Sequence, residues 1–433
     1  MHELCRERCI DGGVRMKTDE IVVALDFGST KITTVVASLN SSENNEGGAH
    51  YKILGVGTSK SAGLKKGFVS NIDETVNALS ESIEEAESNS GAKITSAVIG
   101  ISGPHIQGLN SSGVAGIKGR EVTPVDVKRV IDSASALAIP NDRMPLHVIP
   151  QEYKIDGQDE IRDPLGMVGT RLEAKVHIVT ASRSAIQNLI RCCHKAGIHS
   201  SEIVLQSLAT SGLLLSQDEK ELGVAVIDIG GGTSDFAIYS AGALVHTGGI
   251  ALGGTHLTQD LAIGLRTPQN EAEKLKIEKA CALKSYIDEG ATLEIFPVGG
   301  GAPRIIQQKL VGEIVEPRLE EIFNFLKKEI LQSGYQDKLG AGLVLTGGAT
   351  MLPGTQELAE RVFDLPIKRS LPTAMEGLDA QFVHPSYSSV LGLVEWVSVQ
   401  KRGSRMKRKS TNNVMEPVLN AGKQIKSWFT DLV

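Results

Sequence analysis

The sequence lacks the features that identify several large classes of proteins. It has five cysteines, including the adjacent Cys192 and Cys193, and their spacing forms neither a disulfide framework nor a zinc site. It has no run of about 18 apolar residues that would span a bilayer, and no secretory signal precedes Ile21. We therefore expect a protein that is made and kept in the reducing cytoplasm.

The signatures of the common nucleotide-binding and hydrolytic folds are also missing. A P-loop requires the pattern GxxxxGK[ST], but the one Gly-Lys pair, Gly422-Lys423, is followed by glutamine. The patterns GxGxxG, HExxH and GxSxG do not occur. The sequence thus gives no support for a P-loop or Rossmann enzyme, a zinc protease of this type or an α/β-hydrolase.

The most informative segment present is GVAVIDIGGGTSDFAIYS, at 223–240. An apolar strand ends at Asp228, three glycines follow, and a second strand begins directly afterwards. Glycines at such a turn let backbone N–H groups approach an anion closely, because no Cβ blocks it. The segment predicts a strand, a tight turn that cradles phosphate, and a returning strand.

A second copy of this pattern lies 202 positions upstream. Residues 22–38, VVALDFGSTKITTVVAS, align with 224–240 without a gap, so that Asp26 matches Asp228 and Gly28 matches Gly230. β-Branched and aliphatic residues flank both turns, as expected for buried strands. A single DxG is typical of many ordinary hairpins, whereas two aligned copies indicate two similar lobes that close on one phosphate chain.

A third glycine turn follows much later, in GLVLTGGATMLPG at 342–354. It reads as a strand, a turn at Gly347 and Gly348, and a helix over TQELAERVF. The two glycines would let the backbone approach a flat ring or a phosphate. Alone, such a turn is more often structural, and its significance comes from its order after the two DxG hairpins.

This order of motifs resembles the actin-like ATPases, and most specifically the FtsA family of bacterial cell-division proteins. The resemblance implies an α/β, actin-like (ribonuclease H-like) two-lobed ATPase fold with a small α+β insert, subdomain 1C, and a C-terminal amphipathic helix. It covers nearly the whole chain. The matching segments are DFGSTK near the start, LHVIPQEYKIDG (146–157), ELGVAVIDIGGGTSD (221–235), VGGGAPR (298–304), IVEPRLEEI (314–322) and VLTGGA (344–349).

Motif positions and this resemblance together predict the organisation of the chain. The insert is expected to contain a helix that Thr123 caps and Pro124 opens, with apolar residues at helical spacing as far as Ala138. The predicted units are a disordered leader (1–19), lobe 1 (20–103 and 180–222) interrupted by the insert (104–179), lobe 2 (223–248 and 305–398) interrupted by subdomain 2B (249–304), a basic linker (399–414) and a membrane-targeting helix (415–433).

The resemblance implies that ATP and Mg²⁺ bind between the lobes. Asp26 and Asp228 would hold the metal through waters, and Lys31 would meet phosphate oxygens. Gln206 and Asp228 are the catalytic candidates; a glutamine orients water without removing its proton, so slow hydrolysis is expected. An ordinary structural glutamine at a helix end is the equal alternative for Gln206. The nucleotide-binding candidates are Asp26, Gly28, Ser29, Thr30, Lys31, Gly230, Gly231, Gly232, Thr233, Glu273, Lys276, Gly347, Gly348 and Ala349.

Glu273 and Lys276 lie three apart on one helix face, an arrangement that could offer an acceptor and a donor to adenosine. A plain solvated face is the alternative. In the family, subdomain 2B binds the C-terminal tail of the ring protein FtsZ, and Arg304 and Arg318 match basic positions of the family pattern. Such a tail mixes acidic and apolar residues, so basic groups near an apolar groove should attract it. Either arginine could instead be an ordinary surface residue.

The end of the chain predicts attachment to a membrane surface. Residues 401–409 contain six basic residues and no acidic ones. An amphipathic stripe follows, with Ile425, Trp428, Phe429 and Leu432 on its apolar face, and a polar face opposite excludes a bilayer span. Basic residues favour anionic lipid by about 1 kcal/mol each. From periodicity alone, packing against the body would be the more usual fate of such a helix; the basic linker and the resemblance to the FtsA family favour the membrane instead.

Two functions are consistent with these observations. The first is a nucleotide-switched adaptor that polymerises, binds the FtsZ tail, recruits later division proteins and lies on the cytoplasmic face of the inner membrane at the division site. The second is a small-molecule kinase, for a sugar or acetate, of the same superfamily. The insert and the terminal amphipathic segment favour the adaptor, and neither reading involves nucleic acid. A chaperone ATPase would need a longer C-terminal region than the 81 residues after Leu352.

Overall fold

The computed structural model describes residues 20–39, 51–118, 121–373 and 375–410. The predicted leader, 1–19, and the predicted membrane-targeting helix, 415–433, lie outside the described residues. Among the described helices, none has the length and apolarity needed to cross a bilayer. Two five-stranded sheets organise the described part of the chain.

The first sheet forms the core of lobe 1. Its first three strands are antiparallel neighbours, and two later strands add in parallel on the far side of the first strand. Nearly every side chain of the first two strands is buried, which is why β-branched and aliphatic residues dominate them. In spatial order the strands are β3 (Tyr51–Lys60), β2 (Lys31–Leu39), β1 (Glu20–Phe27), β6 (Ser96–Ile101) and β11 (His199–Leu205).

The second sheet repeats this topology in lobe 2. It too has three antiparallel strands followed by two parallel ones, in the same order. The registers also agree, since Asp26 lies opposite Thr33 and Asp228 opposite Asp235. The internal repeat seen in the sequence is thus confirmed as a repeat of fold. The strands are β14 (Ala243–Ile250), β13 (Ser234–Ser240), β12 (Val224–Ile229), β17 (Leu343–Thr346) and β18 (Ile367–Arg369).

Two helices cross between the lobes. The helix α4 (Gln206–Leu214) follows lobe 1 but contacts β12 and β13, whereas α10 (Ser388–Ser410) follows lobe 2 and packs on β1 and β2. A Cβ on Gly392 of α10 would lie 2.6 Å from backbone atoms of Ala209 in α4, so glycine permits this close crossing. The predicted linker, 399–414, is helical as far as Ser410, because it continues α10.

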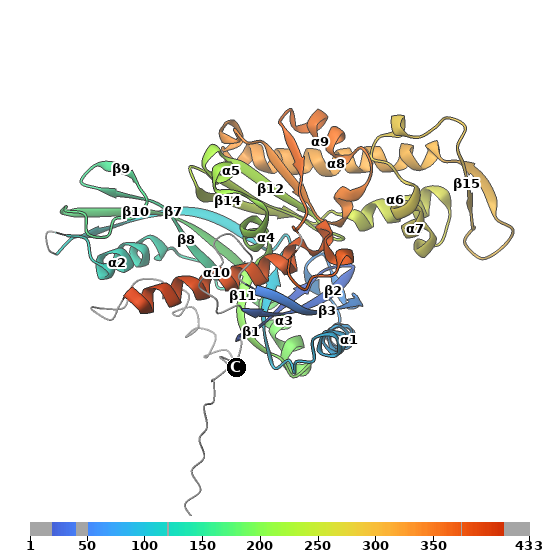
Figure 1. Ribbon diagram of the computed structural model, residues 1–433. Coiled ribbons are helices and arrows are strands. Elements are labelled where there is room, and N and C mark those ends of the chain that lie inside the picture. The colour runs from blue at the N-terminus through green and yellow to red at the C-terminus, as the bar shows by residue number, and fades with distance from the viewer. Residues whose placement is uncertain (1–19, 40–50, 119–120, 374, 411–433) are drawn as a thin grey trace, which may run out of the picture.

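The predicted α+β insert is a separate four-stranded sheet covered by one helix (Figure 1). As predicted, Thr123 caps α2 and Pro124 opens it. That helix ends at Ser135, so Leu137 and Ala138, predicted to continue it, lie beyond its end, and Leu137 is 43% exposed. The elements are β7 (Gln107–Gly116), α2 (Pro124–Ser135), β8 (Arg143–Ile155), β9 (Gln158–Ile161) and β10 (Arg171–Ser182).

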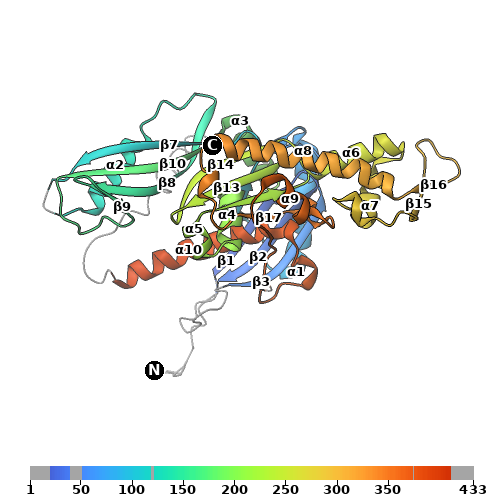
Figure 2. The same ribbon diagram turned by 90° about the horizontal axis from the view of Figure 1, so that it is seen from above.

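A second small region projects from lobe 2 at the opposite end of the molecule from the insert (Figure 2). It contains α6 (Gly254–Leu265), α7 (Gln269–Lys279), and the hairpin of β15 (Thr292–Ile295) and β16 (Arg304–Gln307). The long α8 (Lys309–Ser333) leads back to the lobe. The remaining elements include α1 (Ile72–Ser90), α3 (Arg183–Lys195), α5 (Gln217–Leu222), α9 (Thr355–Phe363) and the short strands β4 (Leu64–Lys65) and β5 (Phe68–Val69).

Candidate functional site: a cleft between two repeated turns

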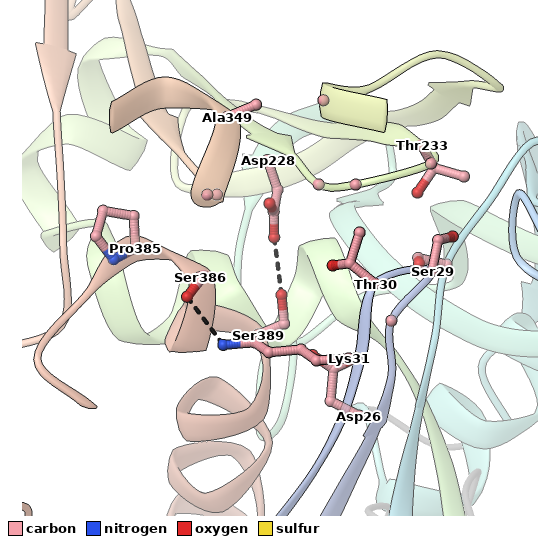
Figure 3. A pocket seen from close by; sticks show the side chains of 18 of the residues that line it. Asp26, Ser29, Thr30, Lys31, Asp228, Thr233, Ala349, Pro385, Ser386 and Ser389 are labelled. Atoms are coloured by element: carbon pink, nitrogen blue, oxygen red, sulfur yellow. Dashed lines mark hydrogen bonds between the residues drawn. The ribbon is translucent and has the colours of Figure 1, made fainter. Parts of the chain in front are cut away.

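The turn between β1 and β2 forms one wall of the cleft. Asp26 lies near the end of β1, and Lys31 begins β2. A Cβ on Gly28 would lie 2.6 Å from the carbonyl oxygen of Lys31, so this tight turn requires glycine. The side chains of Ser29 and Thr30 extend from the turn toward the other lobe (Figure 3).

The turn between β12 and β13 forms the facing wall. The N–H of Gly230 donates to the carbonyl oxygen of Thr233 at 3.0 Å, which closes the hairpin. A Cβ on Gly231 would lie 2.4 Å from Cγ2 of Thr30. A Cβ on Gly232 would lie 2.5 Å from Oγ of Ser29. The two turns therefore contact each other, with hydroxyl side chains of lobe 1 fitted against bare glycines of lobe 2.

The third glycine turn borders the carboxylate of lobe 2. Gly347 follows β17 with a φ of +91°, a conformation that favours glycine. A Cβ there would lie 2.3 Å from Oδ1 of Asp228. Because β17 pairs with β12 beside Asp228, the fold brings this distant segment to the same place.

These elements enclose a cleft of about 320 Å³. Every residue predicted to bind nucleotide or act in catalysis lines it, so the structure brings the whole set together. That set is Asp26, Gly28, Ser29, Thr30, Lys31, Gln206, Asp228, Gly230, Gly231, Gly232, Thr233, Glu273, Lys276, Gly347, Gly348 and Ala349. Nucleotide binding itself stays a prediction.

Burial perturbs the charged groups on both walls. It raises the pKa of the Asp26 carboxyl to about 7, with a further rise from Asp228, while Lys31 and a hydrogen bond from Gln206 oppose it. Burial raises the pKa of Asp228 to about 6, against a hydrogen bond from Ser389. It lowers the pKa of Lys31 to about 8, and Asp26 opposes that shift. Carboxylates held in this way favour a bound cation, which would stabilise their charged forms.

The residues fit Mg²⁺ held largely through waters and phosphate. Asp26 is buried and Asp228 is half-buried, and both present carboxylate oxygens, the ligand type that Mg²⁺ prefers, to the cleft. Within the described residues, no group of three or more histidine, cysteine or acidic side chains is placed to bind a metal directly. Mg²⁺ commonly takes one or two carboxylates and completes its shell with water and substrate oxygens.

Comparison with known proteins identifies the family. The family model described as "Cell division protein FtsA" matches residues 225–392, and that described as "SHS2 domain inserted in FTSA" matches residues 103–180. The cell division protein FtsA of Pseudomonas aeruginosa is 41% identical over 95% of this chain and 98% of its own length. The chain belongs to the FtsA family. The FtsA of Escherichia coli K12 is 36% identical over 87% of this chain and 90% of its own length.

The same fold occurs in proteins more distant than FtsA. A chain in the solved structure of the PilM-PilN type IV pilus biogenesis complex matches with a TM-score of 0.60 and 14% identity, covering 87% of this chain and 98% of that one. At this identity the match concerns the fold alone. With its doubled sheet and α+β insert, this FtsA-family chain has the predicted actin-like fold.

Glu273 and Lys276 of this FtsA-family chain pair with each other at the side of the cleft. The Lys276 ammonium donates to both oxygens of Glu273, at 2.8 and 2.7 Å, and to Oγ1 of Thr258 at 2.9 Å. Lys276 is buried, which the alternative of a freely solvated face does not explain. Both side chains line the cleft, beside Ile277.

The two predicted partner-binding arginines of this FtsA-family chain lie in different settings. Arg304 begins β16 on the projecting hairpin and is exposed, although its guanidinium donates to the carbonyl oxygen of Leu265. Arg318 lies inside α8 and is half-buried, with ion pairs to Asp260 and Glu321. The charge of Arg318 is therefore matched within the chain, whereas Arg304 has no acidic partner among the recorded ion pairs of the described residues.

Sequence reasoning missed several residues that line the FtsA-family cleft, among them two parts that carry ionisable side chains. The first is Asp235, whose pKa burial raises to about 7 and whose Oδ1 accepts from the N–H of Gly103 at 2.9 Å. It ends the DIGGGTSD run and lies opposite Asp228, so the strand register could have revealed it. The second is the segment of residues 384–389, which contributes His384, Pro385, Ser386 and Ser389 to the lining. No motif in the sequence marks that segment.

Proposed function

We propose that this division protein is an ATP-dependent switch whose cleft binds ATP and Mg²⁺ between the two lobes. The observation that supports it best is the meeting of both DxG turns, the TGGA turn and Lys31 around one cleft. Glycine backbones and Lys31 would take the phosphates, and Asp26 and Asp228 would hold the metal through waters. The metal would neutralise phosphate charge between the lobes. Glu273 and Lys276 would face the nucleoside.

Hydrolysis in this proposal is slow. Gln206 begins α4, and its amide donates to Oδ1 of Asp26. A neutral amide can orient water but cannot take a proton from it. The nucleotide would therefore act mainly by holding the lobes together.

We extend the proposal to assembly on a membrane. Closed subunits would polymerise, with exposed apolar side chains on the insert, such as Val125 and Val168, providing contact surface. Residues 415–433 would attach each subunit weakly to anionic lipid at the cytoplasmic face of the inner membrane, and a filament would add avidity. Later division proteins would join this assembly at the division site.

The composition of the projecting hairpin supports the proposal that the FtsZ tail binds there. Exposed Phe296, Val298 and Ile305 surround Arg304 in the sequence of this hairpin, so basic and apolar groups occur together there. A tail that mixes acidic and apolar residues would match both. The Arg304→Glu protein should bind an FtsZ tail peptide about tenfold more weakly. Arg318→Gln, which avoids adding a third acid beside Asp260 and Glu321, is the companion variant; unchanged affinity in both would remove this part of the proposal.

A small-molecule kinase is not favoured, because FtsA proteins match this chain over nearly their whole length. The proposal can be tested with full-length protein, a chain that ends at Ser410, and a Lys31→Ala protein. Calorimetry with Mg-ATP measures binding, and co-sedimentation with vesicles of anionic lipid, with and without ATP and FtsZ, measures attachment. We expect the shortened chain to bind ATP but not vesicles, and Lys31→Ala to lose the effect of ATP. Equal sedimentation of all three proteins would contradict the membrane proposal.

A further inference from the structure

The segment of residues 384–389, which we call the strap, contacts charged groups from both lobes. Its sequence is HPSYSS, and its last two residues, Ser388 and Ser389, begin α10. On the lobe 1 side, the Lys31 ammonium donates to Oγ of Ser386 at 2.9 Å and lies 3.1 Å from the centre of the Tyr387 ring. On the lobe 2 side, Oγ of Ser389 donates to Oδ2 of Asp228 at 2.8 Å. Figure 3 shows both hydrogen bonds.

Further contacts hold the strap in this position. Nδ1 of His384 accepts from the N–H of Ser386 at 3.2 Å and lies 2.9 Å from its hydroxyl oxygen, so the hydroxyl can accept from Lys31 while donating to His384. Ser388, fully buried, shares a hydrogen bond of 2.8 Å with Thr346, the residue paired with Asp228 in the sheet. The strap is thus a fixed support for two charged groups.

The helix α10, which the strap begins, is packed on lobe 1 over residues 390–397. Val390, Leu393, Val394 and Val397 are buried in one apolar cluster with side chains of β1 and β2. In the same stretch, the indole N–H of Trp396 donates to Glu202 at 3.2 Å. Trp396 lies eight residues beyond Ser388, or about 12 Å along the helix axis. A displacement of the strap would therefore move a packed helix and the surroundings of this indole.

We propose that Ser386, Tyr387 and Ser389 are positioning residues that hold Lys31 and Asp228 for a polyphosphate with its divalent cation, and that they transmit occupancy of the cleft to α10. This rests on the proposed function, because it assumes that a nucleotide engages Lys31 and Asp228. A lysine side chain has four flexible carbons, and holding its ammonium beforehand reduces the entropy lost on binding. Coupling is reciprocal, so contacts that favour the bound geometry also respond to the ligand.

The chain carries a natural reporter of this coupling. It has two tryptophans, and a Trp428→Phe background leaves Trp396 on α10 as the single indole. Emission of Trp396 is measured in solution while Mg-ATP is added, and calorimetry on the same proteins shows when the cleft is saturated. We expect a change in emission that saturates with binding.

The strap variants then test the two contacts with Lys31. Ser386→Ala and Tyr387→Leu should bind Mg-ATP about tenfold more weakly and lose most of the Trp396 response at saturation. The conservative Tyr387→Phe keeps the ring under Lys31 and should retain the response. Val399→Ala, on an exposed part of the same helix, is the matched control. If Tyr387→Leu does not fold, Ser386→Ala still decides the question.

The outcomes separate this proposal from the function on which it rests. Saturable Mg-ATP binding with no change at Trp396, or a full response in both strap variants, would overturn the coupling and leave nucleotide binding intact. An absence of any Mg-ATP binding by the unmodified chain would instead overturn the proposed function and this inference with it.

Discussion

The two hairpins that face the cleft have the same strand pairing but different residues in their turns. Between β1 and β2 the turn presents Ser29, Thr30 and Lys31, whereas the equivalent positions between β12 and β13 are Gly231, Gly232 and Thr233. Both hairpins have an aspartate at the same register position, and burial raises the pKa of both carboxyls. The repeat therefore preserves the acid and the strand pairing but not the chemistry of the turn.

This difference makes the two lobes complementary rather than interchangeable. Side chains on the first turn occupy the space that a Cβ on the second would need, at Thr30 against Gly231 and at Ser29 against Gly232. Two identical glycine turns would leave a gap, and two identical FGSTK turns would collide. The turn of lobe 1 thus supplies the Lys31 ammonium and two hydroxyl groups, while the facing turn of lobe 2 supplies glycine backbone.

The largest expected effect tests where the positive charge is needed. Lys31→Ala should weaken binding of Mg-ATP by about 100-fold, because it removes a charged donor from a buried site. Thr233→Ala, at the equivalent position of lobe 2, should weaken it by only about threefold. Calorimetry measures both. Similar losses at the two positions would show that the lobes are chemically equivalent after all.

The second prediction uses pH to compare the aspartates of the two hairpins. The folded-state pKa of Asp26, about 7, exceeds the ordinary value of 3.8, so the folded chain keeps a proton that the unfolded chain has lost. The free energy of unfolding should therefore fall as pH rises from about 4 to 7. Asp26→Asn has no carboxyl here that could lose a proton. Its free energy of unfolding at pH 8 should therefore exceed that of the unmodified chain by about 2 kcal/mol.

Asp228 provides the control for that comparison. The pKa of Asp228, about 6, is raised less, so stability falls over a narrower pH range. Asp228→Asn should therefore gain less free energy of unfolding at pH 8 than Asp26→Asn. Thermal unfolding without nucleotide, at pH 4 and pH 8, measures both variants. If the advantage of Asp26→Asn were greater at pH 4 than at pH 8, the assigned direction of the shift would be wrong.

The repeated turns were predictable from sequence because their determinants are local. Glycines, a strand-ending acid and flanking β-branched residues specify each hairpin, and a gap-free shift of 202 positions gave the correspondence of Asp26 with Asp228. Asp235 was within reach for the same reason, since it lies opposite Asp228 in the pairing. The end of α2 could not be predicted in this way. Apolar residues continue at helical spacing past Ser135 to Leu137, although the helix itself ends at Ser135.

The strap could not be predicted, because its role depends on packing between distant segments. Lys31 and Ser386 are 355 positions apart, and hydroxyl residues before an apolar helix are ordinary at helix starts. Only the paths of β2 and α10 bring them together. Likewise, the ion pair of Arg318 with Asp260 appears once α6 packs on α8.

The third prediction tests the fit between the turns. Gly231→Val places side-chain atoms against Thr30 and should lower the free energy of unfolding by about 1.5 kcal/mol, as overpacking does. Thr30→Gly in the same chain should restore part of that loss, since it exchanges the bulky and bare positions. Chemical denaturation of the single and double variants measures the coupling. If the changes in the free energy of unfolding of the two single variants simply added in the double variant, a direct contact between the lobes would be contradicted.

The smallest effect concerns Thr33, which occupies in lobe 1 the register position that Asp235 occupies in lobe 2. Thr33 is fully buried, and among the described residues its hydroxyl has no hydrogen-bond partner. Thr33→Val should therefore leave the free energy of unfolding within about 0.5 kcal/mol or raise it slightly. The adjacent Thr34→Val is the control, because it breaks a 2.7 Å hydrogen bond with Ser82 and should lower stability by about 1 kcal/mol. A larger loss at Thr33 than at Thr34 would mean that this position, like Asp235, has a polar role, and the two hairpins would be more alike than their contacts indicate.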